Sequence, residues 1–297
     1  MTLTKSTCLN CIINDLWEAL LLLNLSENKN FLILKEVLKF LNNEFSNTKT
    51  PSYYITGVHR ILKNIANISV PFSKIRENCN KIGVEISEKL KKEIKNLDSK
   101  EKIKLLIKWV IAGNHLDFRT VGTGYNFDVS TIEAMLKKWV NKGLTISQTN
   151  EIIDSIMKSK QILYIHDNVG EIAFDKLLIE ELKKYASITS VLRGGAITSD
   201  ATVYDAEMVG LKETSNRIIN TGTDTLGILY EEISEELKIA ISESDLIIIK
   251  GQANYYTFSE PVIKRRGIVS LFSTKCHVVA NEFNLKDRIN NIAAILK

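Results

Sequence analysis

The chain has 297 residues, of which 44% are hydrophobic and 25% are charged. These values are those of a globular protein with one large domain or two ordinary ones, and they exclude a disordered or fibrous chain. Thirty-nine basic residues against 35 acidic ones give a net charge of +4. Because the lysines alternate with glutamates and form no arginine-rich, aromatic-interleaved pattern, we expect no nucleic-acid partner.

We expect neither a membrane span nor a secretory signal. The apolar run 16–25 is interrupted by Glu18, so it is too short and too charged to cross a bilayer. It also lacks the basic start and the cleavage site of a signal peptide. The cysteines are too few and too scattered for a disulfide framework: Cys8, Cys11, Cys79 and Cys276. We therefore expect a cytoplasmic protein without a membrane partner.

Residues 1 to about 150 show helical periodicity almost throughout. Apolar residues recur at intervals of three and four, and strand-like alternation is nearly absent. The segments expected to be helical are 12–25, 31–45, 53–68, 72–97, 102–112, 130–139 and 147–158. We predict an all-helical N-terminal domain over residues 1–150.

From about residue 160, short apolar segments rich in β-branched residues alternate with helical segments. The expected strands are 162–165, 188–192, 217–219, 246–249 and 268–272, with 278–280 as a further candidate. The expected helices between them are 172–184, 201–210, 226–241 and 255–266. This alternation is typical of a parallel sheet covered by helices on both faces. We predict that residues 151–297 form a Rossmann-like, three-layer αβα domain with a mostly parallel sheet, which places the whole chain in the α/β class.

Polar side chains follow the predicted strands where each strand ends. The segments are Asp167-Asn168, Arg193-Gly194-Gly195 leading to Asp200, Asn220 to Asp224, and Lys250-Gly251-Gln252-Ala253-Asn254. Because the carboxyl ends of parallel strands lie on one edge of a sheet, we expect these segments to face one cleft.

The residue types in these segments indicate metal and phosphate chemistry. Asp167, Asn168 and Asp200 form an oxygen-rich set suited to Mg²⁺ or Mn²⁺ and not to zinc. Lys250 adds a positive charge for a phosphoryl group, and the glycine turns offer backbone N–H donors. For any single segment a structural role, as a helix cap or a solvated lysine, explains the residues better. Four such segments on one edge favour the functional interpretation.

Six ordered motifs resemble those of one known family and cover nearly the whole chain. They are Cys8-Leu-Asn-Cys11, Ala112 to Phe118, Asp167 to Asp175, Arg193-Gly-Gly, Asp200-Ala-Thr, and Lys250 to Tyr255. Together they resemble the metal-dependent damage-control phosphatases, formerly the domain of unknown function 89. The CxxC motif of Cys8 and Cys11 resembles the signature of subfamily I, the stand-alone microbial branch.

The resemblance implies an all-helical domain beside an αβα domain and a divalent metal held by Asp167, Asn168 and Asp200. Mn²⁺ is the expected ion, with Ni²⁺, Co²⁺ and Mg²⁺ as alternatives. Catalytic roles follow for Asp167 and Lys250, and residues 250–254 are implied to line the phosphate site. The implied activity is hydrolysis of phosphate esters of small metabolites, either sugar phosphates or damaged nucleotide-type metabolites, in metabolite damage control.

The expected substrate site contains side chains from several motifs. Its members are Asn114, Asp117, Arg193, Lys250, Gly251 and Asn254. Asn114 and Asp117 belong to a segment that can extend from the helical domain over the cleft. His115 and His166 flank the site motifs, and we expect packing or hydrogen-bonding roles for them.

Several alternatives stay open at this level. Asp167 can attack phosphorus or can only bind the metal while water attacks; the missing second aspartate two residues on favours water. A transferase that uses the same metal site and a non-catalytic phosphometabolite-binding protein are competing functions. For Cys8 and Cys11 a surface or redox-sensitive pair is favoured over a zinc site, because structural zinc needs four ligands.

Overall fold

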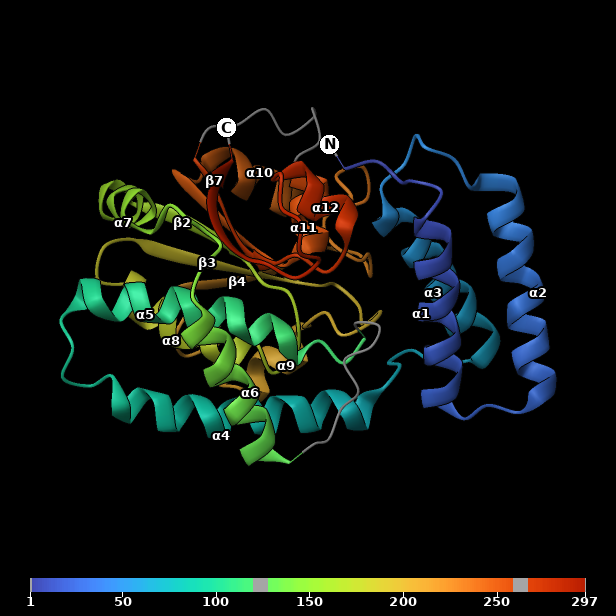
Figure 1. The fold of residues 1–297 in the computed structure, drawn as a ribbon, viewed down its shortest axis with the longest axis horizontal. Helices are drawn as coiled ribbons and strands as arrows, with labels where there is room; N and C mark the ends of the chain where they lie inside the picture. Colours follow the sequence, from blue (N-terminus) through green and yellow to red (C-terminus); the bar gives the residue numbers. More distant parts are fainter. Residues whose placement is uncertain (1, 120–127, 259–266, 297) are drawn as a thin grey trace.

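The structure, a computed structural model, describes residues 2–119, 128–258 and 267–296 (Figure 1). Its first half consists of helices: α1 (Cys8–Leu23), α2 (Glu27–Glu44), α3 (Pro51–Ala66), α4 (Ser73–Glu93), α5 (Ser99–Ala112), the 3₁₀ helix η1 (Gly113–Leu116) and α6 (Val129–Lys142). No helix among the described residues is long and apolar enough to span a membrane.

The second half alternates strands with helices. The strands are β1 (Ile146–Ser147), β2 (Gln161–Ile165), β3 (Ser187–Leu192), β4 (Arg217–Asn220), β5 (Leu246–Lys250), β6 (Ile268–Ser273) and β7 (Asn291–Leu296). The helices are α7 (Thr149–Lys158), α8 (Ile172–Leu182), α9 (Val203–Met208), α10 (Glu235–Glu243), α11 (Gln252–Phe258) and α12 (His277–Glu282).

The described strands form one sheet in the order β1-β7-β6-β5-β2-β3-β4. Neighbouring strands are parallel except β6 and β7, which are antiparallel. The predicted α/β class and mostly parallel sheet are therefore confirmed. β2 lies between β5 and β3, so the segments that follow these three strands emerge side by side at one edge.

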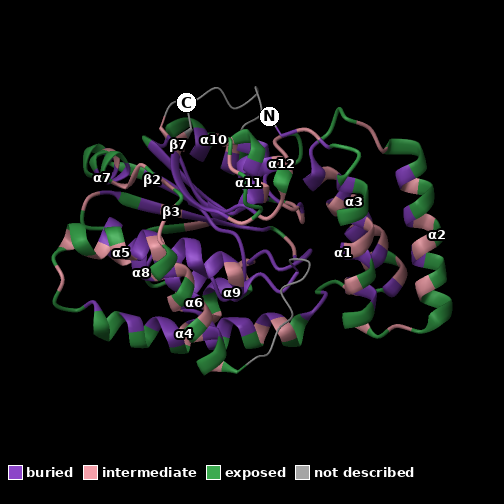
Figure 2. Ribbon diagram, viewed as in Figure 1, coloured by how far each residue is buried: buried purple, intermediate pink, exposed green. Residues whose placement is uncertain are grey.

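Alternate side chains of the strands enter two hydrophobic cores, one on each face of the sheet. Ile162 and Tyr164 of β2 join the core formed with α4, α5 and α8, whereas Leu163 and Ile165 join the core formed with α10. Figure 2 shows the strands buried between these two layers of helices. The nearly continuous apolar strands are explained by this burial on both faces.

Helices α1, α2 and α3 form a lobe beside the sheet (Figure 1). α3 packs against both α1 and α2 through apolar residues at helical spacing, including Leu16, Ile33 and Val58. Asn24 and Asn67 end α1 and α3 in the left-handed conformation, which is a common way to stop a helix.

Packing does not follow the predicted division near residue 150. The change from helices to strands does occur close to it, at β1 and α7. However, α4 and α5 pack directly on α8, and α5 also contacts β6 and β7, so these N-terminal helices form one outer layer of the sheet. The lobe that stands apart from the sheet contains α1, α2 and α3 (Figure 1).

The five main strand predictions agree with the structure to within one residue at each end. The further candidate 278–280 was wrong, because these residues lie inside α12; a three-residue apolar run does not distinguish a strand from a short helix. The sequence analysis also missed β1 and β7.

Several predicted helices differ in extent. In the first half, α1 and α2 begin four residues before their predicted starts, and α4 ends four residues before its predicted end. In the second half, two predicted helices differ by more than two residues at one end. The segment 226–234 is a loop and only 235–243 is helical, because Gly227 has φ +70° and approaches the carbonyl group of Ala253 closely. The predicted helix 255–266 begins earlier, at Gln252, and is described to Phe258; residues 259–266 lie outside the described part.

Candidate functional site

Backbone pairing brings the predicted metal ligands together. Asn168, after β2, and Asp200, after β3, form an isolated antiparallel bridge. The amide of Ala201 donates to the carbonyl oxygen of Asp167 at 2.7 Å, and that of Val169 donates to Ser199 at 2.9 Å. The two segments thus meet as a short ladder beyond the sheet, and Asp167, Asn168 and Asp200 line one cavity.

Each of these side chains is held by neighbours from other motifs. Asp167 Oδ2 accepts from the amide nitrogens of Asn114 and Asn168 at 2.8 and 2.7 Å. Asp200 Oδ2 accepts from Arg193 Nε at 2.6 Å. Arg193 is fixed in turn because its Nη2 donates to Asn254 Oδ1 at 3.0 Å.

The motif after β5 requires glycine at position 251 for two reasons. Its φ is +80°, and a Cβ at this position would collide with the carboxylate of Asp167. The absence of a side chain therefore leaves the space in which Asp167 sits, and Gly251 contributes to the site through its backbone position.

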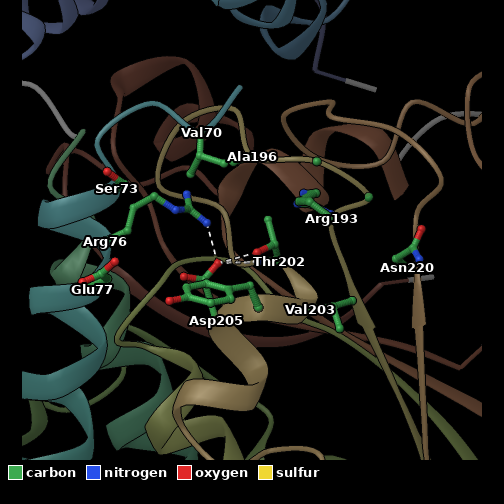
Figure 3. A pocket seen from close by; sticks show the side chains of 13 residues that line it. Val70, Ser73, Arg76, Glu77, Arg193, Ala196, Thr202, Val203, Asp205 and Asn220 are labelled. Carbon is green, nitrogen blue, oxygen red and sulfur yellow. Dashed lines mark hydrogen bonds and ion pairs between the residues drawn. The ribbon is translucent and has the colours of Figure 1, made fainter. Parts of the chain in front are cut away.

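Helix α4 clamps the two segments from behind. Arg76 donates to the carbonyl oxygens of Thr198 and Asp200, both at 2.8 Å, and forms an ion pair with Asp205 at 2.5 Å. Figure 3 shows Arg76 reaching from α4 to Asp205, which also accepts from Thr202, beside a cavity of about 700 Å³. Asn80 adds a hydrogen bond from the amide of Gly170 at 2.8 Å. The positions of both ligand segments therefore depend on one helix.

Lys250 does not reach the cavity. Its side chain is completely buried, and Nζ contacts Glu171, Asp175 at 2.8 Å and the carbonyl oxygen of Val110 at 3.0 Å. These contacts use the three protons of the ammonium group. Burial works to lower the pKa of Lys250, but Asp175 and Glu171 outweigh it and raise the pKa. The observed contacts of Lys250 are structural, and the direct phosphate contact predicted for it stays a prediction.

Lys275 is the lysine that lines the cavity. It follows β6, and its ammonium group forms an ion pair with Asp117. Burial opposes its charge, but Asp117 and Asp167 outweigh burial and raise the pKa of Lys275, so the side chain is cationic. The sequence analysis missed it, although the same rule of polar residues after a strand applies to Thr274 and Lys275.

The other predicted substrate residues divide into two groups. Asp117 lines the cavity. Asn114, Arg193 and Asn254 are buried. Asn114 donates to Asp167 and Arg193 donates to Asp200, whereas Asn254 acts indirectly by accepting from Arg193. Their contact with substrate stays a prediction, and positioning is the role that the observed bonds support.

The arrangement of charges fits a hard cation. Burial raises the pKa of Asp167 well above its usual range, and the nearby charges of Glu171 and Asp200 raise it further. Ser199 Oγ lies 2.8 Å from Asn168 Oδ1 and 2.5 Å from Asp117 Oδ1, yet a hydroxyl has one proton to donate. The site thus holds more acceptor oxygens than donors, and a cation would satisfy the excess.

This candidate set depends on an amide oxygen. Among residues 2–119, 128–258 and 267–296, no three His, Cys, Asp or Glu side chains are grouped so as to hold a metal ion. A cation at the two carboxylates would therefore take Asn168 Oδ1 as its third protein ligand.

The CxxC cysteines lie at the same cavity. Cys8 and Cys11 line it together with Cys276 and His277. Burial raises the pKa of both Cys8 and Cys11, so neither thiol is activated as a thiolate. The fold brings these residues near one another without forming a metal-binding group within the described part of the chain.

Both flanking histidines have structural contacts. The ring of His115 stacks on Trp139 with centroids 4.0 Å apart. His166 Nδ1 lies 2.8 Å from Asp175 and Nε2 lies 3.0 Å from Ser190. These contacts match the packing and hydrogen-bonding roles expected for them.

Comparison with known proteins identifies the family and the fold. Residues 4–289 match the family model described as the damage-control phosphatase ARMT1-like domain. The chain is 33% identical over 285 residues to an uncharacterised protein of Methanocaldococcus jannaschii, covering 95% of this chain and 92% of that protein. It is 28% identical to a damage-control phosphatase of Archaeoglobus fulgidus, with 94% of each chain covered. The crystal structure of a DUF89 family protein of Pyrococcus horikoshii matches at a TM-score of 0.90, with 26% identity and complete coverage of both chains.

The buried position of Lys250 predicts a loss of stability when it is replaced. In Lys250→Met, Glu171 and Asp175 keep their buried charges without the ammonium group, so the free energy of unfolding should fall by about 3–5 kcal/mol in urea titrations. The exposed Lys183→Met on the same helix layer should change it by less than about 0.5 kcal/mol. A Lys250→Met protein as stable as the wild type, but without phosphatase activity, would instead assign Lys250 to substrate.

The burial of His115 should make the free energy of unfolding depend on pH. Burial and the charge of Lys275 lower the pKa of His115 to about 3. Between this value and the unfolded pKa of about 6.5, the unfolded state binds more protons, so stability falls as pH falls through that window. From pH 7.5 to 5 this amounts to about 2 kcal/mol, which His115→Phe should lose while it keeps the stacking on Trp139.

The matched control for this measurement is His277→Phe, which removes an exposed histidine. Its free energy of unfolding should depend on pH as that of the wild type does. If His115→Phe and the wild type show the same pH dependence in urea titrations at pH 5 and 7.5, His115 is not held neutral by the fold.

Proposed function

Because the chain belongs to the damage-control phosphatase ARMT1-like family, we propose that it is a metal-dependent phosphatase acting on phosphate monoesters of small metabolites. The observation that carries the proposal is the convergence of Asp167, Asn168, Asp200 and Lys275 on one cavity of about 510 Å³. This volume suits a sugar phosphate or a nucleotide-sized ester. The relative from Archaeoglobus fulgidus, named a damage-control phosphatase, supports the reaction class.

The ligand set proposed for the divalent cation is Asp167, Asn168 Oδ1 and Asp200, with Mn²⁺ as the ion expected first. When bound, the cation would supply charge neutralisation and an activated water. Asn114 and Asn168 both donate to Asp167 Oδ2, which orients the carboxylate and leaves Oδ1 for the cation. We assign Asp167 as a ligand, with water as the nucleophile.

Lys275 is proposed to bind the phosphoryl oxygens. Its ion pair with Asp117 uses one direction of the ammonium group and fixes the side chain in the cavity wall. Positive charge placed beforehand at the transferring group stabilises the negative charge that it carries in the transition state. Asp117 therefore acts as a positioning residue, because it holds Lys275 and lies within reach of the Ser199 hydroxyl.

Asp200→Asn tests the cation site. The substitution keeps size and one oxygen ligand but removes a negative charge, so Mn²⁺ affinity should fall roughly 100-fold and turnover with it. Raising the Mn²⁺ concentration should restore part of the phosphate release. The exposed Asp154→Asn is the control and should match the wild type. Full activity in Asp200→Asn at low Mn²⁺ would move the active site elsewhere.

Lys275→Met tests the phosphate site. Mn²⁺ should still bind, measured by calorimetry, while kcat/KM for phosphate esters falls about 100-fold to 1,000-fold because the phosphoryl group loses its fixed charge. Added Mn²⁺ should not restore the rate, in contrast to Asp200→Asn. Lys286→Met, an exposed lysine, serves as the control. If excess Mn²⁺ rescues Lys275→Met as well, the roles assigned to the two residues are wrong.

A further inference from the structure

Arg119 is a buried arginine in the wall of the same cavity whose donors are only partly used. It follows η1, is 5% exposed and lines the cavity. Its Nη2 donates to Asp15 Oδ1 at 2.8 Å and to the Asp15 carbonyl oxygen at 2.6 Å. Nε and Nη1 are buried and have no hydrogen-bond partner in the described structure. Buried donors without partners are costly, so such groups indicate an absent ligand or water.

The guanidinium group is held in place from several sides. Asp15 Oδ2 lies 2.6 Å from Nε2 of His59, and this contact fixes the carboxylate that Arg119 binds. The Arg119 guanidinium carbon lies 4.9 Å from the ring centroid of Phe72. The Arg119 amide donates to Asp117 at 3.0 Å, which ties this arginine to the residue that pairs with Lys275. Arg119 is thus preorganised relative to the phosphate site.

Helix α1 gives the outer wall of the cavity a polar character. The α1 segment contributes residues at helical spacing: Thr7, Asn10, Cys11, Asn14 and Asp15. The amides of Asn10 and Asn14, with Gln252 opposite, suit the hydroxyl groups of a hydrophilic substrate. Arg119 contacts the last of these α1 residues, Asp15, whereas Asp167 and Asp200 belong to the αβα part of the cavity.

We infer that Arg119 forms a subsite for a second anionic group, so that the preferred substrates carry a carboxylate or a second phosphate in addition to the phosphate that is cleaved. The inference rests on the proposed function, since it places the scissile phosphate at Asp167, Asp200 and Lys275. It names a substrate class, phosphorylated acids and bisphosphates, and it assigns specificity to the helical wall.

Three phosphonates of equal chain length test the subsite through binding, because their C–P bonds are not hydrolysed. Butylphosphonate has one anionic group, 4-phosphonobutanoate adds a carboxylate, and butane-1,4-bisphosphonate adds a second phosphonate. Calorimetry on the Mn²⁺-loaded protein should give at least about tenfold tighter binding for one or both of the compounds with a second anionic group than for butylphosphonate. We call the ratio of a compound's affinity to that of butylphosphonate its advantage. The compound with the advantage shows whether the subsite binds a carboxylate or a second phosphate.

Arg119→Met should reduce this advantage to less than about threefold, while Arg217→Met, which removes an exposed arginine on β4, should keep it. The advantage is a ratio within one protein, so partial loss of folded material does not change it. Arg119→Lys keeps a charge with fewer donors and should give a smaller advantage than the wild type. An equal advantage in wild type and Arg119→Met, or none in the wild type, overturns the subsite. Phosphate release from ordinary esters is measured separately and judges the proposed function alone.

Discussion

One buried ammonium group connects most of the site. Lys250 leaves the end of β5 and contacts Glu171 and Asp175 on the α8 side and Val110 on α5. A charge in this position is tolerated only with excellent compensation, because desolvation costs several kcal/mol for each ion. Glu171, the partner of Lys250, also accepts from Asn114 at 3.1 Å and from Asn168 at 2.9 Å. The ion pair therefore joins the central strand β5, the helices α5 and α8 on one face of the sheet, and two site residues.

The same network sets the electrostatics of the cavity. Lys250 compensates Glu171 and Asp175 from behind, whereas Asp167 and Asp200 face the cavity with Arg193 and Lys275 as the nearest cations. Arg193 pairs with Asp200 and Lys275 pairs with Asp117, so Asp167 is the carboxylate of this set that has no ion pair among the described residues. A motif of charged residues can thus serve two purposes, one buried and structural and one exposed to ligand, and only the direction of each side chain separates them.

The positions of the charged residues could be predicted from the sequence, but the direction of each side chain could not. Asp167, Asn168 and Asp200 were placed correctly at one edge because the alternation of apolar strands and helices indicates parallel strands, whose carboxyl ends lie on one edge of the sheet. The contacts of Lys250 were not predictable in the same way, since Asp175 on α8 and Val110 on α5 both lie far from it in the chain. Lys275 obeys the same rule as Asp167, because it follows the carboxyl end of the parallel strand β6. The environment of Arg119 could not be predicted from the sequence, because it depends on contacts with Asp15 and, through Asp15, with His59. Both are far away in the chain.

The cavity also divides its tasks between two parts of the molecule. The candidate ligands and Lys275 come from segments after β2, β3 and β6, where the sheet fixes their spacing. Asp15 and His59 come from α1 and α3, and Arg60 and Lys63 on α3 pair with Asp224 to join this lobe to the loop after β4. Changes in the helical lobe can therefore alter which substrates fit while the ligand geometry is preserved. On the proposed function, the chemistry would thus be carried by the segments after the strands and the choice of substrate by the helical lobe, because the two sets of residues lie on separate parts of the chain.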